Sequence, residues 1–193
     1  MYEWQANAFL LRPGRVLDKD LHPFTVGHAF LLESINSPYF HGGKRTKEDL
    51  LIAVMICSQS FEDASLFIVQ PPADLKKQVK KWGRYASAGR TGLDLDGSQF
   101  EKYIQEYSRM PDRWIDPDPV KAMKSHDSAF PSTMRVAWNL MSHGVSEKDA
   151  YNMPYNRALQ YYGIEVESNG GRYVTSEEDA VIDELPETDN GNS

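Results

Sequence analysis

Three histidines in the first part of the chain, His22, His28 and His41, are residues that could bind a metal or transfer a proton. Six and thirteen residues separate them, which fits neither a pair one helical turn apart nor a zinc-finger spacing. His28 also falls within a periodic apolar series that runs from Phe24 to Ile35, where a hydrogen-bonded core histidine is the commoner structure. The sequence therefore predicts no metal and no cofactor, and we regard an enzyme that uses His28 or His41 as a remote alternative.

A glycine-containing loop from His41 to Thr46 superficially resembles a phosphate-binding loop, because Gly-Lys precedes a helix start. A Walker motif needs a glycine five residues before its Gly-Lys pair and a Ser or Thr directly after the lysine. This chain has Pro38 and Arg45 at those two positions, so the match fails at both. What is left is a flexible basic turn that could at most hold an anion weakly.

The single cysteine, Cys57, excludes a disulfide framework and favours a reducing compartment. Its position inside an apolar run predicts a small core residue instead of a nucleophile. The N-terminal sequence has an acid and a tryptophan where a signal peptide needs a basic lead, and no long apolar span follows. We therefore expect a soluble, cytoplasmic protein.

The most continuously apolar segment lies between Thr46 and Phe61. Thr46 followed by Asp49 is typical of a helix N-terminal capping box. The run from Leu50 to Cys57 is apolar on every side at helical length, so this helix must be covered from more than one direction. The sequence therefore predicts a buried central helix. Its apolar run is too short to cross a bilayer.

Periodic apolar residues elsewhere predict an all-α fold, with about six helices in one globular domain. A turn is expected at Pro13-Gly14 and a loop at residues 86–97. Three of the other expected helices are one of about fourteen residues from Pro23 to the break at Asn36-Ser37-Pro38, a basic one from Leu75 to Arg84, and one of about ten residues capped by Ser98 and Glu101. A further helix, with a buried face at Met134, Ala137, Trp138 and Met141, should end at Gly144. A very short helix capped by Ser146 and Asp149 should follow, and then a helix from Pro154 to Tyr162 that Gly163 ends.

The net charge of −7 is concentrated at the C-terminal end. Residues 164–193 carry nine acids and one arginine, a charge of −8, which leaves +1 for residues 1–163. The C-terminal segment is also rich in Gly, Ser, Asn and Thr, with few apolar residues, so most of it cannot recover the entropy of ordering. We therefore predict a helical domain at residues 1–163 and an acidic, mostly disordered tail at 164–193. A short partner-binding helix near Glu177 to Leu185 is the alternative.

A basic helical face is the strongest feature for nucleic-acid binding. It consists of Lys76, Lys77, Lys80, Lys81 and Arg84. Phosphate contacts need such a face, but the domain is nearly neutral and exposed aromatic residues do not alternate with the lysines. We therefore expect a solvated surface and no nucleic-acid partner.

The helix expected at 154–162 is the candidate partner-binding element. Tyr155, Leu159 and Tyr162 share one face, which offers more apolar surface than a single core contact would use. Arg157 is its basic residue and completes the candidate set. Helix faces rich in methionine and tyrosine near the C-terminus suit adaptable recognition of an apolar partner.

Two parts of the chain carry a resemblance to a known family. The segment GVSEKDAYNMPYNRALQYY resembles the ending of many tail assembly chaperones of tailed phages and of related tail-module proteins. The segments LHPFTVGHAFLLESINSPYF and DLLIAVMICSQSFEDA are similar to the front half of such phage and prophage proteins. Together these cover residues 21–65 and 144–162. The resemblance implies a small helical protein of the host cytoplasm that binds the long tape measure protein during tail assembly, without catalytic residues.

Two hypotheses follow. The first is a non-enzymatic tail assembly chaperone, or another phage morphogenesis factor, that binds the tape measure protein or another tail protein. The second is a helical nucleic-acid-binding protein of the phage packaging type, based on the lysine face and on the short helix pair at 146–162. Neither needs a cofactor, a metal or a membrane.

Overall fold

The computed structural model describes residues 14–74, 77, 79–81, 93–108, 113–115, 130–168 and 172–174. The chain divides into two compact units, one of Met1–Arg109 with Ser128–Tyr162 and one of Met110–Asp127 with Gly163–Ser193. The protein is mostly helical, which confirms the predicted all-α class.

The first unit begins with a β-hairpin that the sequence did not predict. Strands β1 (Gly14–Val16) and β2 (Lys19–Leu21) are antiparallel, with Gly14 opposite Leu21. Leu17 and Asp18 connect them with φ values of 52° and 56°, the left-handed conformation that a tight hairpin turn requires. The expected turn at Pro13-Gly14 is therefore wrong in position, because Gly14 is already paired in the sheet; Pro13 lies outside the described residues.

Helices α2 (Val26–Ser34) and α3 (Pro38–His41) follow the hairpin. Thr25 caps α2 through a capping box with His28, so the helix starts two residues after Phe24 and is shorter than the sequence indicated. Ser37 caps α3 at the break that the sequence predicted, and Pro38 occupies its first turn.

The central apolar helix is present as α4 (Lys47–Cys57). The predicted capping box of Thr46 and Asp49 is confirmed, and the helix buries Leu50, Leu51, Ala53, Val54, Ile56 and Cys57. It ends at Cys57, because Ser60 caps a separate helix, α5 (Phe61–Val69), which the sequence analysis missed. The signal was available: Ser60 and Asp63 have the same spacing as Thr46 and Asp49.

Helix α7 (Leu93–Ser108) is longer than predicted. Its start at Leu93 places Ser98 inside the helix, so the expected cap of Ser98 with Glu101 and the loop at 93–97 are both wrong. The predicted buried side is confirmed, because the side chains of Phe100, Tyr103, Ile104 and Tyr107 are at most 6% exposed.

The C-terminal helices are α9 (Ser132–Ser142), α10 (Glu147–Asn152) and α11 (Tyr155–Ser168). The predicted helix end at Gly144 is confirmed by its φ of 87°, and α10 ends at Asn152 as expected. Helix α11 continues through Gly163, which the sequence predicted to end it; one interior glycine costs only about 1 kcal/mol.

The second unit contains an antiparallel pair of strands, β3 (Arg113–Ile115) and β4 (Arg172–Val174). Trp114 is the register partner of Tyr173. Part of the predicted tail is therefore structured: residues 164–168 belong to α11, and residues 172–174 form β4. Residues 175–193 lie outside the described part of the chain.

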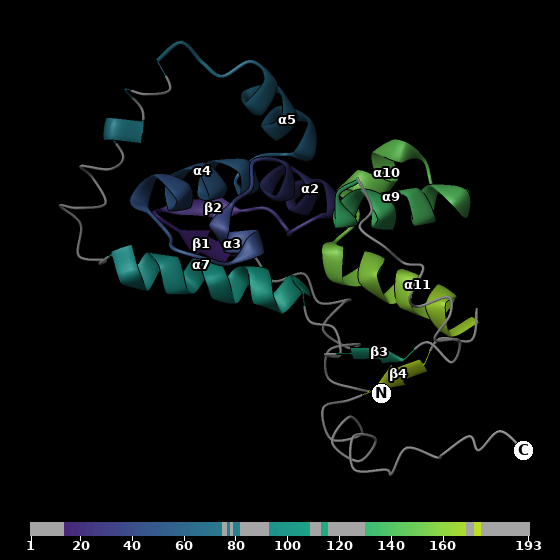
Figure 1. Ribbon diagram of the computed structural model, residues 1–193. Helices are drawn as coiled ribbons and strands as arrows, with labels where there is room; N and C mark the ends of the chain where they lie inside the picture. Colours follow the sequence, from purple (N-terminus) through teal and green to yellow (C-terminus); the bar gives the residue numbers. More distant parts are fainter. Residues whose placement is uncertain are drawn as a thin grey trace, which may run out of the picture. The chain divides into compact units, whose positions relative to one another are not determined.

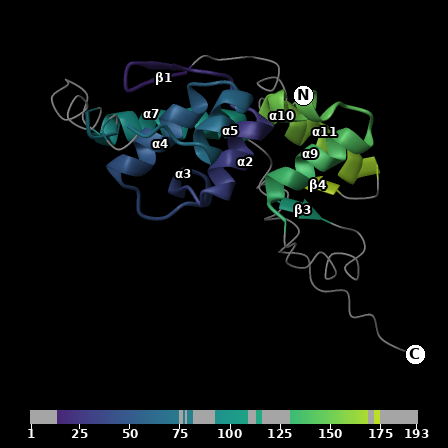
Figure 2. The ribbon, with the colours of Figure 1, turned by 90° about the horizontal axis from the view of Figure 1, so that it is seen from above.

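Within the first unit, the β1–β2 hairpin lies between α4 and α7 (Figure 1). Helices α9 and α10 pack against α2, and the second view shows them on the side of α2 that is away from α7 (Figure 2). The aromatic ring of Phe24, which is fully buried, lies at the centre of this packing. Its ring centroid is 5.8 Å from those of Tyr103 on α7 and Tyr155 on α11.

Gly27 on α2 is required by close packing against α5. A Cβ added at Gly27 would overlap the ring of Phe61, which is itself stacked on Tyr151 at 4.8 Å and has little room to move.

We expect Gly27→Ala to lower the free energy of unfolding by about 1–3 kcal/mol in urea titrations, although alanine is the better helix former. Gly97→Ala on α7 is the milder comparison, because its added Cβ would lie 3.3 Å from the nearest atom, the Tyr39 hydroxyl, whereas the Cβ added at Gly27 would overlap Phe61. Equal effects of the two substitutions would contradict this packing.

Candidate functional site

The histidine with the strongest sequence signal, His28, is part of the core. It is 1% exposed; its Nδ1 accepts a hydrogen bond from the Thr25 backbone N–H at 3.2 Å, and its Nε2 donates to the Gln59 carbonyl at 2.9 Å. Burial lowers the pKa of His28 to about 4, so the ring is neutral at pH 7. This confirms the hydrogen-bonded core histidine that the sequence predicted. Both ring nitrogens are occupied, so His28 has no free position for a substrate or a metal.

The other candidates for chemistry are also structural. Cys57 is fully buried, and burial raises the pKa of its thiol far above the ordinary range, as expected for a core residue. Asp96 is 2% exposed, with one carboxylate oxygen that makes no hydrogen bond, but it lies in the first turn of α7, where the helix dipole favours a negative charge. Among the described residues, no group of three or more His, Cys, Asp or Glu side chains could hold a metal ion.

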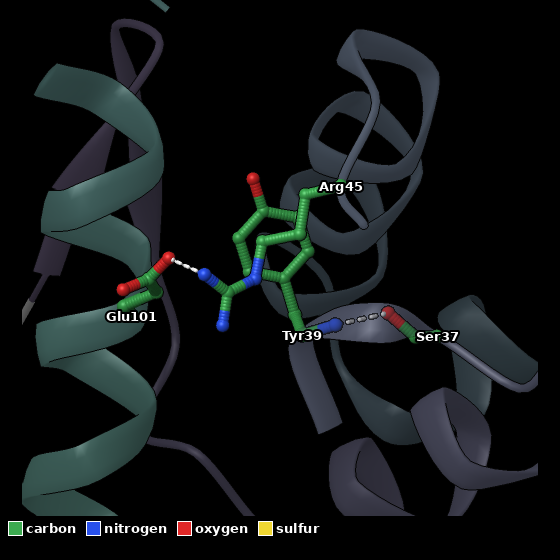
Figure 3. Close-up of polar contacts among 4 residues, drawn as sticks. All are labelled: Ser37, Tyr39, Arg45 and Glu101. Carbon is green, nitrogen blue, oxygen red and sulfur yellow. Dashed lines mark hydrogen bonds and ion pairs between the residues drawn. The ribbon is translucent and has the colours of Figure 1, made fainter. Parts of the chain in front are cut away.

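The loop from His41 to Thr46 uses its arginine for packing. Figure 3 shows the Arg45 guanidinium between the ring of Tyr39 and the carboxylate of Glu101 on α7. The guanidinium carbon lies 5.2 Å from the Tyr39 ring centroid, which is a cation–π contact. This cluster ties the loop between α3 and α4 to α7.

The N-terminus of α4, which the sequence suggested as a weak anion site, is already occupied by a carboxylate. The Asp49 side chain accepts hydrogen bonds from the Thr46 backbone N–H at 2.8 Å and from the Thr46 hydroxyl at 2.7 Å. A bound anion would be repelled by Asp49, so this loop is a poor candidate for phosphate binding.

The predicted partner-binding residues of α11 lie mostly in the core. Tyr155 and Leu159 are only 8% and 6% exposed, so the prediction that their face stays available is wrong. The Tyr155 N–H donates to the Phe24 carbonyl at 2.8 Å, and burial raises the pKa of its hydroxyl to about 12. Tyr162 and Arg157 are half-buried. The physical reason is the pairing of the Met153–Tyr155 segment with Phe24–Val26, which places this side of α11 against the central aromatic ring.

An exposed apolar surface is found instead on α9. We define the α9 surface by Phe130, Met134 and Trp138, which are 66%, 37% and 69% exposed. The sequence placed Met134, Trp138 and Met141 in the core with Ala137; only Ala137 is fully buried, and Met141 is half-buried. The buried residues of α9 are Thr133, Val136, Ala137 and Leu140.

The carboxylate of Glu33 on α2 fixes the start of α9. Its oxygens accept hydrogen bonds from the backbone N–H groups of Ser132 at 2.8 Å and Thr133 at 3.0 Å, and from both hydroxyls. Pro131, at the N-cap position, makes no side-chain cap of its own. Glu33 therefore caps α9 from a different helix and ties the start of α9 to α2.

Capping also determines the ionisation of Glu33. Partial burial acts to raise the pKa of this carboxyl, but the hydrogen bonds from Thr133 and Ser132 outweigh it and hold the pKa below its usual value. The carboxylate is therefore charged at pH 7, as a helix N-terminus prefers.

The lysine face is only partly described. Lys77, Lys80 and Lys81 are exposed, whereas Lys76 and Arg84 lie outside the described residues. Within the described part of the chain, these three lysines make no ion pair or side-chain hydrogen bond. Their exposure agrees with the predicted outer side of this helix, and the absence of a nucleic-acid partner stays a prediction.

Comparison with known proteins adds no relative: no family model, no curated protein and no solved structure matches this chain. None of the described helices combines the length and the apolar character needed to span a membrane. The candidate functional site is therefore chosen on physical grounds, and the α9 surface is the strongest candidate because large exposed apolar clusters commonly mark interaction sites.

The Glu33 cap can be tested through pH. A carboxylate with a lowered folded-state pKa contributes stability above its unfolded pKa and loses that contribution as the pH falls through the folded pKa. We expect Glu33→Gln to lower the free energy of unfolding by about 1–2 kcal/mol at pH 7, and the difference from wild type to shrink towards about pH 3.

The measurement is a series of urea titrations from about pH 7 to about pH 3. Glu48→Gln is the matched control, since Glu48 is an exposed acid in the first turn of α4 and is only a weak dipole partner. A difference between Glu33→Gln and wild type that stays constant across the series would contradict a charged cap.

Proposed function

We propose that this protein is a non-enzymatic binding protein that holds a partner protein on the α9 surface. The observation that carries the proposal is Trp138, which is 69% exposed and lies one helical turn from Met134 on the same side of the helix. Exposed tryptophan is uncommon on ordinary protein surfaces and is enriched at the energetic centres of interfaces. The opposite side of α9 is buried against α2 and α10, so the surface is presented on a supported helix.

The partner class that we propose is the tape measure protein of a tailed phage, or another tail protein, bound in the host cytoplasm during tail assembly. The support is the resemblance of residues 21–65 and 144–162 to tail assembly chaperones, which in the structure form α2 to α5 and α10 to α11. A chaperone for a long helical protein must cover its apolar surface until assembly replaces the contact. The α9 surface takes the role that the sequence analysis gave to Tyr155, Leu159 and Tyr162.

Co-expression tests this proposal. We expect the wild-type protein to raise the soluble yield of the tape measure protein and to co-purify with it, because the α9 surface covers apolar segments of that partner. Trp138→Asp should remove both effects, since it places a charge at the centre of the contact. The measurement is the soluble fraction of the partner after lysis and affinity capture.

Leu95→Asp is the matched control, because Leu95 is a 52% exposed leucine on α7 that is not part of the α9 surface. It should leave the effect intact, and melting curves must show both variants folded. No co-purification with folded wild-type protein would exclude the chaperone function, and equal losses in the two variants would exclude the α9 surface as its site.

A nucleic-acid-binding protein of the phage packaging type is the second candidate. It is favoured by Lys77, Lys80 and Lys81, which are exposed on one short helical segment and are not neutralised by ion pairs. Three lysines without stacking aromatic residues among the described positions give only a small electrostatic contribution.

We therefore expect no salt-sensitive binding of the purified protein to duplex DNA in fluorescence anisotropy titrations. Binding that weakens steeply from about 50 to 200 mM salt, and that is lost in the Lys77→Glu, Lys80→Glu, Lys81→Glu variant, would reverse the order of the two candidates. Lys19→Glu, on the β-hairpin, is the single-charge control.

A further inference from the structure

The α9 surface has a charged edge of one sign. Arg135 is exposed and lies three residues before Trp138, a spacing that makes the two positions neighbours on the surface of α9. Arg135 makes no ion pair with any described residue. From Phe130 to Val145 the sequence contains no Asp or Glu. The surface is therefore apolar with a positive edge.

Among the described residues, neither Glu33 on α2 nor Asp149 on α10 forms an ion pair with Arg135. Both oxygens of Glu33 already accept hydrogen bonds from Ser132 and Thr133 at the helix start. Asp149 on α10 accepts a hydrogen bond from the Ser146 hydroxyl at 2.6 Å. The positive edge at Arg135 is thus left for a group outside these contacts.

The spacing of the apolar side chains indicates the shape of the occupant. Met134 and Trp138 are four residues apart and form a ridge along the side of α9, and the exposed Phe130 lies just before the helix, next to its N-cap Pro131. Ridges of this spacing pack into the groove between side chains of a second helix. An extended peptide would instead need a free sheet edge for its backbone hydrogen bonds, which a helix does not offer.

We infer that the α9 surface binds an amphipathic helix of the partner whose apolar stripe is flanked by a carboxylate, and that Arg135 pairs with this carboxylate. The inference rests on the proposed function in one respect, that α9 is the binding surface, and it adds the chemistry of the partner. The apolar ridge supplies the buried area, and Arg135 selects the orientation and the acidic flank of the incoming helix.

A second copy of this chain does not fit the same surface. If two α9 helices packed together, each Arg135 would meet a stretch that contains no acid, and both guanidinium groups would lose water without gaining a partner. Charge complementarity therefore favours a different protein with an acidic flank.

The test uses three synthetic helical peptides with the same leucine stripe, flanked by glutamate, glutamine or lysine. Labelled peptides are titrated with the full-length protein, and binding is followed by fluorescence anisotropy at low and at physiological salt. We expect the wild-type protein to bind the glutamate peptide about tenfold more tightly than the lysine peptide. Arg135→Glu should invert this preference, and Trp138→Asp should abolish binding of all three peptides.

Arg15→Glu is the matched charge control, because Arg15 is an exposed arginine on the β-hairpin, where it pairs with Asp18 and Asp20. It should leave the preference unchanged, and melting curves confirm that every variant is folded. Equal affinity for the three peptides, or a preference that Arg135→Glu does not alter, would overturn the inference. So would light scattering that shows a wild-type dimer which Trp138→Asp converts to a monomer, because a second copy would then occupy the surface.

Failure of this inference is distinguishable from failure of the proposed function. If Trp138→Asp abolishes co-purification of the tape measure protein while Arg135→Glu changes no peptide preference, the α9 surface is kept as the binding site. The pairing of Arg135 with an acidic flank of the partner is then rejected. If the peptides show the inverted preference but the tape measure protein does not co-purify, the selectivity stands and the partner is a different acid-flanked helical protein.

Discussion

The burial of Phe24 is the interaction on which the first unit depends. Its ring contacts His28 on α2, Tyr103 and Tyr107 on α7, and Tyr155 on α11, so one side chain joins elements that are far apart in sequence. The backbone beside it is tied as well, because the Phe24 carbonyl and the Val26 N–H bond to Tyr155 and Met153. Aromatic pairs of this edge-to-face kind favour one arrangement over a loosely packed core.

Because of this pairing, the exposed apolar surface lies on α9 and not on α11, where the sequence predicted it. Since Tyr155 packs against Phe24 and Leu159 is buried, α11 cannot also offer that side to a partner. Helix α9 is apolar on two sides: Val136, Ala137 and Leu140 are buried, and Met134 and Trp138 are exposed. This side of α11 is thus used for core packing, whereas the exposed Met134 and Trp138 of α9 lie outside the aromatic contacts around Phe24.

The sequence could predict those features of the fold that depend on interactions between residues close together in the chain. The central helix and its Thr46 cap, the core position of His28 and the buried side of α7 follow from spacing and from capping residues a few positions apart. The rotation of α9 could not be predicted, because the group that caps it lies 99 residues earlier, on α2. The same limit explains the wrong partner face on α11, where apolar periodicity shows that a face is buried or bound but does not tell the two apart.

The exposure of Trp138 supports the proposed role of the α9 surface in partner binding, because the same helix could have buried this side chain. A turn of α9 about its axis would bring Trp138 and Met134 towards α2 and expose Val136 and Leu140, two smaller apolar side chains. Burying the larger aromatic surface would yield more hydrophobic stabilisation. The Glu33 cap anchors the start of α9 to α2, and Trp138 stays 69% exposed on the other side of the helix. A partner that covers Trp138 would recover this stabilisation in the complex.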